Sequence, residues 1–171
     1  MRDLKKLSNC LKFSISKDET RLQLNGVTHN SKLSALVSTD GHVATVLKTC
    51  YNKKLADIII DSNFCTIDRE YPNIAGIIPD FSTLEEDHYK IEKKHYIKTK
   101  IYNPIFFCGE GVIKIDKPEK FLFALDTNKL KTIADGSKYT VFYRNELSPV
   151  IFMLNKVDFF VVMPVRVPSD E

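Results

Sequence analysis

The same order of predicted elements, a helix followed by three strands, occurs at both ends of the chain and limits the folds that the chain can adopt. Residues 2–14 place leucines near helical spacing with charged residues between them, which predicts an amphipathic helix. Three apolar segments of strand length follow, up to residue 49. Residues 126–167 repeat the order: a short helix capped by Asp126 or Thr127 ends at Gly136, and three strands follow. We therefore expect an α+β fold of antiparallel sheets with two short helices.

The first repeat contains a strong hairpin signal. Asp40-Gly41 separates the segments LSALVST (33–39) and HVATVLKT (42–49). An Asp-Gly pair between two strands is typical of a type I′ turn, in which both central residues need positive φ. The sequence therefore predicts a tight antiparallel hairpin here.

The middle of the chain is less regular. Segment 70–80 contains two prolines and predicts a loop with apolar anchors. Residues 82–100 are highly charged and show no clear period, so helix and strand both remain open. Further strands are predicted at 21–29, 56–61, 63–67, 111–116 and 121–126.

Composition bounds the class of protein. The chain has 171 residues, 43% of them hydrophobic, enough for one core or two very small domains. Its net charge of +3 neither demands nor excludes a nucleic-acid partner. The start lacks a signal peptide, and no apolar run approaches the ~20 residues that span a bilayer, so we expect a cytoplasmic protein. Free thiols are favoured over two disulfides for the four widely spaced cysteines, Cys10, Cys50, Cys65 and Cys108.

Catalytic motifs are missing from the sequence. There is no H-E-x-x-H, no G-x-S-x-G and no glycine-rich phosphate loop among the six glycines. His88 and His95, with Glu85, Glu86 and Glu92 nearby, leave a metal site open, but a solvated charged face is the favoured interpretation. We expect a protein without catalytic residues, metal or cofactor.

Four motifs in one order resemble the bacterial DNA sliding clamp, the β subunit of DNA polymerase III. They are L-N-G-V at 24–27, T-D-G-H at 39–42, Y-P-N-I-A-G-I-I-P at 71–79 and V-V-M-P-V-R-V at 161–167. The family reads L-N-G-V, T-D-G-H, F/Y-P-x-Y-x-x-V-I-P and V-x-M-P-M-R-L. Its F-N-P-x-Y-L is echoed weakly at 124–130.

This resemblance implies a DNA-clamp-like processivity fold in a shortened form. Clamp subunits carry three domains, whereas we expect one clamp-like domain over 1–171. Residues 1–80 resemble the family's middle domain, and 119–167 resemble the end of its last domain. Residues 82–118 match no part of the family and are predicted to be an insertion. Reduced clamps of this kind suggest a phage or another mobile element as the source.

The resemblance also implies a groove that binds short peptides of polymerase or repair proteins. In the family, arginines often occupy the positions of Val43 and Gly76. If those arginines hydrogen-bond the peptide, the absence of each one here would weaken peptide binding by about 1–2 kcal/mol. The residues carried over to the groove are Leu24, Thr39, Gly41, His42, Val43, Pro72, Ile77, Val161, Met163, Pro164, Val165 and Arg166.

Contact with double-stranded DNA is the second property implied. Clamp helices hold the duplex through sequence-independent phosphate contacts. The candidate side chains here are Lys5, Lys6, Lys12, Lys129 and Lys131. Encirclement would require several copies in a closed ring, so a homo-oligomer is a candidate assembly. The alternative is a regulatory or decoy module that keeps the scaffold without encircling DNA.

Overall fold

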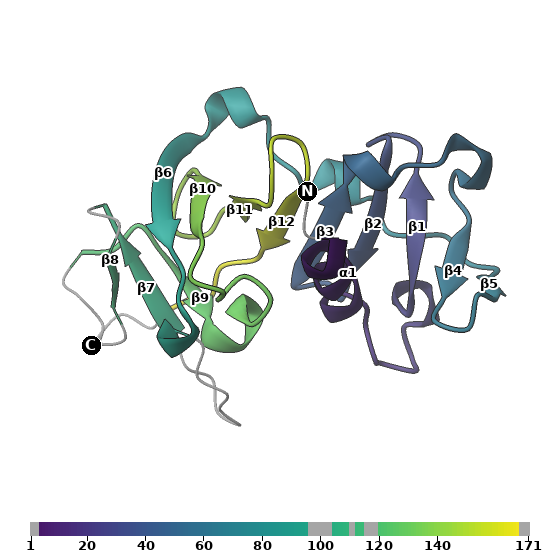
Figure 1. Ribbon diagram of the computed structural model, residues 1–171, viewed down its shortest axis with the longest axis horizontal. Coiled ribbons are helices and arrows are strands. Elements are labelled where there is room, and N and C mark those ends of the chain that lie inside the picture. The colour runs from purple at the N-terminus through teal and green to yellow at the C-terminus, as the bar shows by residue number, and fades with distance from the viewer. Residues whose placement is uncertain (1–3, 96–103, 110–111, 115–119, 168–171) are drawn as a thin grey trace. The chain divides into compact units, whose positions relative to one another are not determined.

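The computed structural model describes residues 4–95, 104–109, 112–114 and 120–167 (Figure 1). Its backbone contacts divide the chain into two compact units. Residues 1–78 and 153–161 form the first unit, and residues 79–152 and 162–171 form the second. A single clamp-like domain with an insertion stays a prediction.

The first unit is a helix on an antiparallel sheet. Its strands run in the order β5-β4-β1-β2-β3-β12, and the β1–β2, β2–β3, β1–β4 and β4–β5 pairs are antiparallel. Three-ten helices at Leu22–Leu24, Lys48–Cys50, Lys53–Leu55 and Ile74–Gly76 connect the strands. The main elements are α1 (Leu4–Phe13), β1 (Gly26–Asn30), β2 (Ala35–Thr39), β3 (Val43–Leu47), β4 (Ile59–Asp61), β5 (Thr66–Ile67) and β12 (Phe159–Val162).

The second unit contains two groups of strands. In one the order is β11-β10-β6 and in the other β8-β7-β9, and the β10–β11, β6–β10, β7–β8 and β7–β9 pairs are antiparallel. The strands are β6 (Glu85–Lys90), β7 (Pro104–Cys108), β8 (Val112–Lys114), β9 (Phe123–Asp126), β10 (Lys138–Tyr143) and β11 (Val150–Met153). Its three-ten helices are η5 (Phe81–Thr83), η6 (Lys93–His95) and η7 (Thr127–Leu130).

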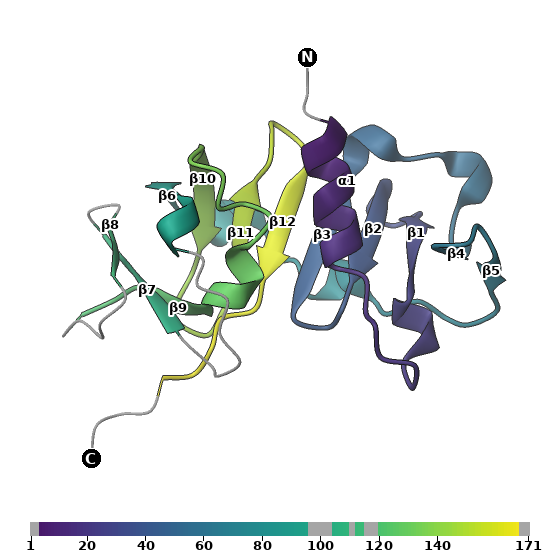
Figure 2. The same cartoon turned by 60° about the horizontal axis from the view of Figure 1, so that its bottom comes forward.

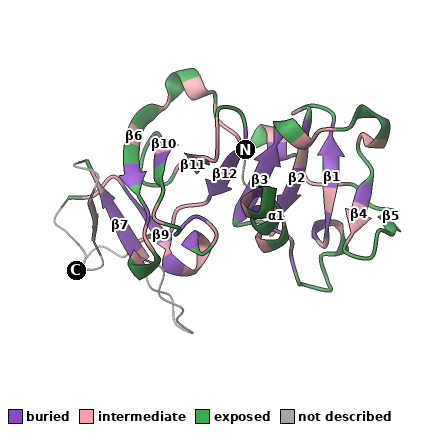
Figure 3. Cartoon of the chain, viewed as in Figure 1, coloured by how far each residue is buried: buried purple, intermediate pink, exposed green. Residues whose placement is uncertain are grey.

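The segment predicted to be an insertion supplies part of the second core. Strands β6, β7 and β8 all fall within 82–118, and Tyr89, Phe106 and Phe107 on them are buried. Figure 3 shows β7 and β9 coloured as buried along much of their length. The stretch 82–100, left open between helix and strand, forms β6 and then η6, and residues 96–100 lie outside the described part.

Helix α1 lies across β2 and β3 (Figure 2). It buries Leu7 and Cys10. The last carbonyls of a helix lack intrahelical partners, and hydroxyls beneath α1 supply them. Thr45 Oγ1 donates to the Cys10 carbonyl and Ser38 Oγ to the Leu11 carbonyl, both at 3.0 Å. The sequence prediction of a helix at 2–14 is confirmed over Leu4–Phe13.

Two sequence predictions need correction. The strand predicted at 21–29 begins only at Gly26, because Leu24 N donates to the Arg21 carbonyl and closes a three-ten turn at Leu22–Leu24. At Gly26 the backbone of β4 is so close that an added Cβ would lie 2.5 Å from the Ile60 carbonyl oxygen. The second predicted helix is only the three-ten helix η7, although Asp126 caps it as expected by accepting from the Asn128 N–H at 2.9 Å.

All four cysteines lie within the described residues and are free thiols. Within the same residues, no helix has the length and apolar character that crossing a membrane requires.

Two histidines, buried His29 and half-buried His95, predict a pH dependence of stability. His29 Nδ1 accepts from the Asn52 N–H, and His95 Nδ1 from the Glu92 N–H, both at 3.0 Å. Burial lowers the pKa of each ring, and Lys94 lowers the pKa of His95 further. As pH falls through about 6.5, the unfolded chain takes up protons that the folded chain refuses, so the free energy of unfolding should fall.

Urea denaturation at pH 7.5 and pH 5.5 checks this expectation. The double variant His29→Gln/His95→Gln should flatten the difference between the two pH values. The carboxylates with lowered pKa, Asp57 and Glu92 among them, respond only as pH falls through about 4, outside this window. Greater stability of the wild-type chain at pH 5.5 would contradict the assignment.

Candidate functional site

The predicted docking residues of the first unit fall into a buried and an exposed set. Leu24, Thr39, Val43 and Val161 are buried and belong to the core. Gly41 and His42 are exposed on the connection between β2 and β3. Pro72 is half-buried, and Ile77 is 43% exposed. The exposed set is the one available to a partner.

The β2–β3 connection is held by hydrogen bonds to its own backbone. Asp40 Oδ1 accepts from the N–H groups of His42 and Val43, both at 2.8 Å. Thr39 Oγ1 accepts from Gly41 N at 3.0 Å and donates to the Val43 carbonyl at 2.6 Å. Together these bonds hold His42 on a fixed, solvent-facing loop.

The geometry corrects the predicted turn type. Among the described residues with positive φ, Gly41 at +92° lies in this connection but Asp40 does not. The turn is therefore not type I′, in which Asp40 would also have a positive φ. The Asp40 carboxylate instead accepts two backbone N–H groups of the turn. Gly41 also lies against Arg21, whose Nη1 would be 3.2 Å from an added Cβ.

Two of the predicted docking residues near the end of the chain, Val165 and Arg166, line a pocket in the second unit. Met163, Pro164 and Val165 are half-buried, and Arg166 is exposed. Val165 N donates to the Ala124 carbonyl at 2.9 Å, which fixes this segment beside β9. The pocket has a volume of about 400 Å³ and is lined by Phe121, Glu146, Leu147, Val165, Arg166 and Val167.

Local turn chemistry brings the far wall of this pocket into place. Asn145 Oδ1 accepts from Leu147 N at 3.0 Å and from Ser148 Oγ at 2.9 Å, and these bonds form the turn between β10 and β11. Leu147 is thereby left 50% exposed. The pocket thus combines apolar walls with one acid, Glu146, and one base, Arg166. The residues predicted for the groove include Val165 and Arg166 but not the adjacent Val167, and Phe121, Glu146 and Leu147 come from other segments.

The lysines predicted to contact DNA differ in exposure. Lys5 and Lys12 are exposed on α1, and Lys131 is exposed just after η7. Lys6 and Lys129 are half-buried and already engaged in interactions within the protein. Residues 5 and 12 are seven apart, close to two helical turns, so both lysines lie on one side of α1.

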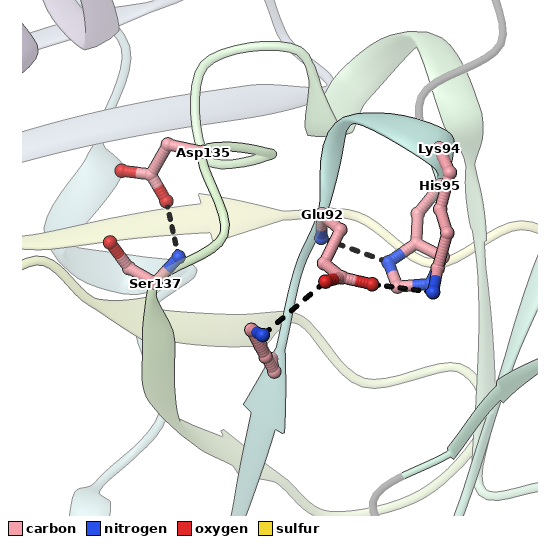
Figure 4. A network of polar contacts seen from close by, with 6 residues as sticks. Glu92, Lys94, His95, Asp135 and Ser137 are labelled. Carbon is pink, nitrogen blue, oxygen red and sulfur yellow. Dashed lines mark hydrogen bonds and ion pairs between the residues drawn. The ribbon is translucent and has the colours of Figure 1, made fainter.

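The alternative metal site is not assembled in the described part of the chain, where no group of three or more potential ligands occurs. His88 lies on β6 with Nε2 3.8 Å from Glu86. Figure 4 shows instead how His95 folds back onto the Glu92 N–H. The pKa of Glu92 is lowered by hydrogen bonds from Lys94 and Lys90, as expected for a solvated charged face.

Comparison with known proteins bears on the fold. No protein-family model and no curated protein matches the sequence. Among solved structures, the DNA polymerase III β subunit of Borrelia burgdorferi, in complex with a natural product, has a TM-score of 0.72 at 16% identity, over 96% of this chain and 61% of that one. The sliding clamp of Bartonella birtlesii bound to griselimycin gives 0.68 at 16%, over 96% and 64%.

The polymerase sliding clamp of Bacillus subtilis agrees, with a TM-score of 0.62 at 16% identity over 97% of this chain and 63% of the clamp. The chain therefore has the bacterial sliding-clamp fold, and the predicted fold class and family resemblance are confirmed at that level. It spans less than two thirds of the length of the clamps it matches.

Proposed function

We propose that this chain is a non-catalytic, clamp-like cytoplasmic protein of DNA replication that docks short peptides of polymerase or repair proteins. The clamp fold supports the replication role. Exposed His42 and Ile77 in the first unit and half-buried Val165 in the second supply candidate contacts.

The pocket beside Val165 is the observation that carries the proposal. Its volume of about 400 Å³ falls in the range of small-ligand sites, about 300–1,000 Å³. Phe121, Leu147 and Val167 give it walls suited to an apolar anchor. Arg166 and Glu146 at the same pocket can fix the register of a peptide backbone or a polar side chain. We assign one apolar anchor of the docked peptide to this pocket.

A fluorescein-labelled clamp-binding peptide with two apolar anchors should bind the full chain with micromolar or tighter affinity. Val165→Glu should weaken binding at least about tenfold, because it brings an unpaired carboxylate into the apolar wall. Val157→Glu is the matched control, since Val157 is 40% exposed on a turn of the first unit, outside this pocket. Fluorescence anisotropy measures both variants.

Circular dichroism should show that both variants remain folded. The docking proposal would be contradicted if calorimetry detected no saturable binding of the peptide by the folded wild-type chain. It would also be contradicted if the two variants lost the same amount of affinity.

Electrostatic contact with double-stranded DNA is the second part of the proposal. Exposed Lys5 and Lys12, on one side of α1, can each neutralise a phosphate and release a condensed counterion. Lys5→Glu/Lys12→Glu should lower affinity about tenfold or more at 50 mM salt and reduce the salt dependence by about two counterions. Anisotropy with a labelled duplex at several salt concentrations gives both values.

The charge-matched control for the DNA experiment is Lys53→Glu/Lys54→Glu, which changes two exposed lysines on a different element of the first unit. Equal effects of the two double variants would show that only net charge matters and that α1 is no DNA-contacting face.

The decoy alternative differs in assembly. A clamp that encircles DNA must form a closed ring of several copies, because one chain of this length cannot surround a duplex. Light scattering on the purified protein distinguishes the two hypotheses. A closed oligomer supports a clamp that encircles DNA, and a monomer supports the regulatory or decoy module.

A further inference from the structure

A polar cavity of about 230 Å³ opens to solvent on the first unit, because Ser31, Lys32, Asp57, Glu70 and Asn73 of its lining are exposed. One wall is strand β1, a second is Asp57, whose φ is +60°, and a third is the loop 70–73. Of the residues predicted for the peptide groove, it includes only Pro72. Its lining residues are Thr28, Asn30, Ser31, Lys32, Asp57, Glu70, Tyr71, Pro72 and Asn73.

One hydroxyl group of this lining, Thr28 Oγ1, belongs to a residue only 1% exposed and has no hydrogen-bond partner among the described residues. Burial raises the pKa of Tyr71 well above its usual value, and the nearby Thr39 N–H only partly opposes this, so the phenol stays protonated. A buried polar group without a partner is unfavourable, and in native proteins a ligand or ordered water usually satisfies it.

The charged residues of the lining favour a cation. Asp57 Oδ1 accepts from Ser31 N at 3.0 Å, and the pKa of Asp57 is lowered by its hydrogen bonds to Ser31, so the group is an ionised carboxylate at neutral pH. Glu70 adds a second carboxylate, against the single ammonium of Lys32. The lining therefore offers acceptors from two carboxylates and from the unpartnered hydroxyl of Thr28.

We propose that this cavity binds a guanidinium group. A guanidinium carries five N–H donors in a planar fork, which matches several acceptors spread around a small cavity better than a compact ammonium does. The group can belong to an arginine side chain of a partner or to a free small guanidine. This inference stands apart from the peptide pocket of the second unit.

Nuclear magnetic resonance titration of the full chain tests the proposal. The probe is N-acetyl-arginine methylamide, and its neutral isostere is N-acetyl-citrulline methylamide. The arginine probe should shift the backbone amides of Ser31 and Asn73 in a saturable way, and the citrulline probe should bind at least about fivefold more weakly. Methylguanidinium distinguishes the sources: binding equal to the arginine probe indicates a free ligand, and much weaker binding indicates a partner's side chain.

Three substitutions test the chemistry of the cavity. Glu70→Gln should weaken the arginine probe about two- to fivefold, and Lys32→Gln should tighten it by a similar factor. Thr28→Val, nearly isosteric, should also weaken it; should that variant fail to fold, the two charge variants still decide. Glu19→Gln, an exposed acid outside the lining, should have no effect. Equal binding of the arginine and citrulline probes would show that the cavity does not recognise the guanidinium charge, and no shift with either would show that it binds neither probe; each result would overturn the proposal.

Discussion

Replacing Asp158 with alanine is expected to lower the free energy of unfolding by about 3–5 kcal/mol. The side chain is completely buried at the start of β12. Oδ1 accepts from Thr49 N at 3.0 Å, and Oδ2 accepts from Thr49 Oγ1 and Asn155 Nδ2, both at 2.6 Å. Alanine leaves all three donors, two on Thr49 and one on half-buried Asn155, without their acceptor.

Matched variants separate lost hydrogen bonds from lost volume. Asp158→Asn keeps one acceptor oxygen and should cost less, and Thr49→Val removes only one of the donors. A double-mutant cycle between positions 49 and 158 should give a coupling energy of about 1–3 kcal/mol. Asp68→Ala changes an exposed aspartate and should stay within about 0.5 kcal/mol. Urea denaturation that gave the same result for Asp68→Ala and Asp158→Ala would refute this account.

The same residue shows why local chemistry is predictable from sequence. Asn155 closes the turn that leads to Asp158, because its Oδ1 accepts from the N–H groups of Val157 and Asp158. Asp126 likewise caps η7 as predicted. Each of these hydrogen bonds joins residues two or three positions apart, so both partners can be recognised in one short stretch of sequence. The hydrogen bonds from Thr49 to Asp158 could not be predicted in this way, because the two residues are 109 positions apart in the sequence.

Predictions failed where one local interaction competed with another. Asp40-Gly41 fits a type I′ turn, but the Asp40 carboxylate satisfies two N–H groups and keeps its own φ negative.

Strand β7 was not predicted because its apolar run is short, begins at Pro104 and is buried on both sides, so it lacks the alternation that marks a half-buried strand.

The candidate site shows a different limit. Family motifs selected Leu24 and Val43 for the groove, and both are buried in the core. An apolar residue in a strand serves a core and a pocket wall equally well, so its type does not separate the two roles. Phe121 and Leu147 line the pocket of the second unit, and the unpartnered hydroxyl of Thr28 lines the cavity of the first. Folding alone brings such residues together, which is why no motif marked them.

Substitution of Phe107 by alanine should be as severe as loss of Asp158, about 3–5 kcal/mol of unfolding free energy. The side chain is completely buried in the second unit. Its ring is stacked on Phe123 with centroids 4.6 Å apart, and Tyr89 meets it edge-on at 5.1 Å. Alanine removes both ring contacts and leaves a cavity that the surrounding strands cannot fully close.

Phe64 provides the control because the same substitution there removes the same atoms from water instead of from a core. Its side chain is 90% exposed on the β4–β5 connection, so Phe64→Ala should change the free energy of unfolding by no more than about 0.5 kcal/mol. Phe107→Leu should recover much of the loss by filling part of the cavity. Urea denaturation measures all three variants. If Phe107→Ala and Phe64→Ala were equally mild, the aromatic cluster around β7 would not be the core of the second unit.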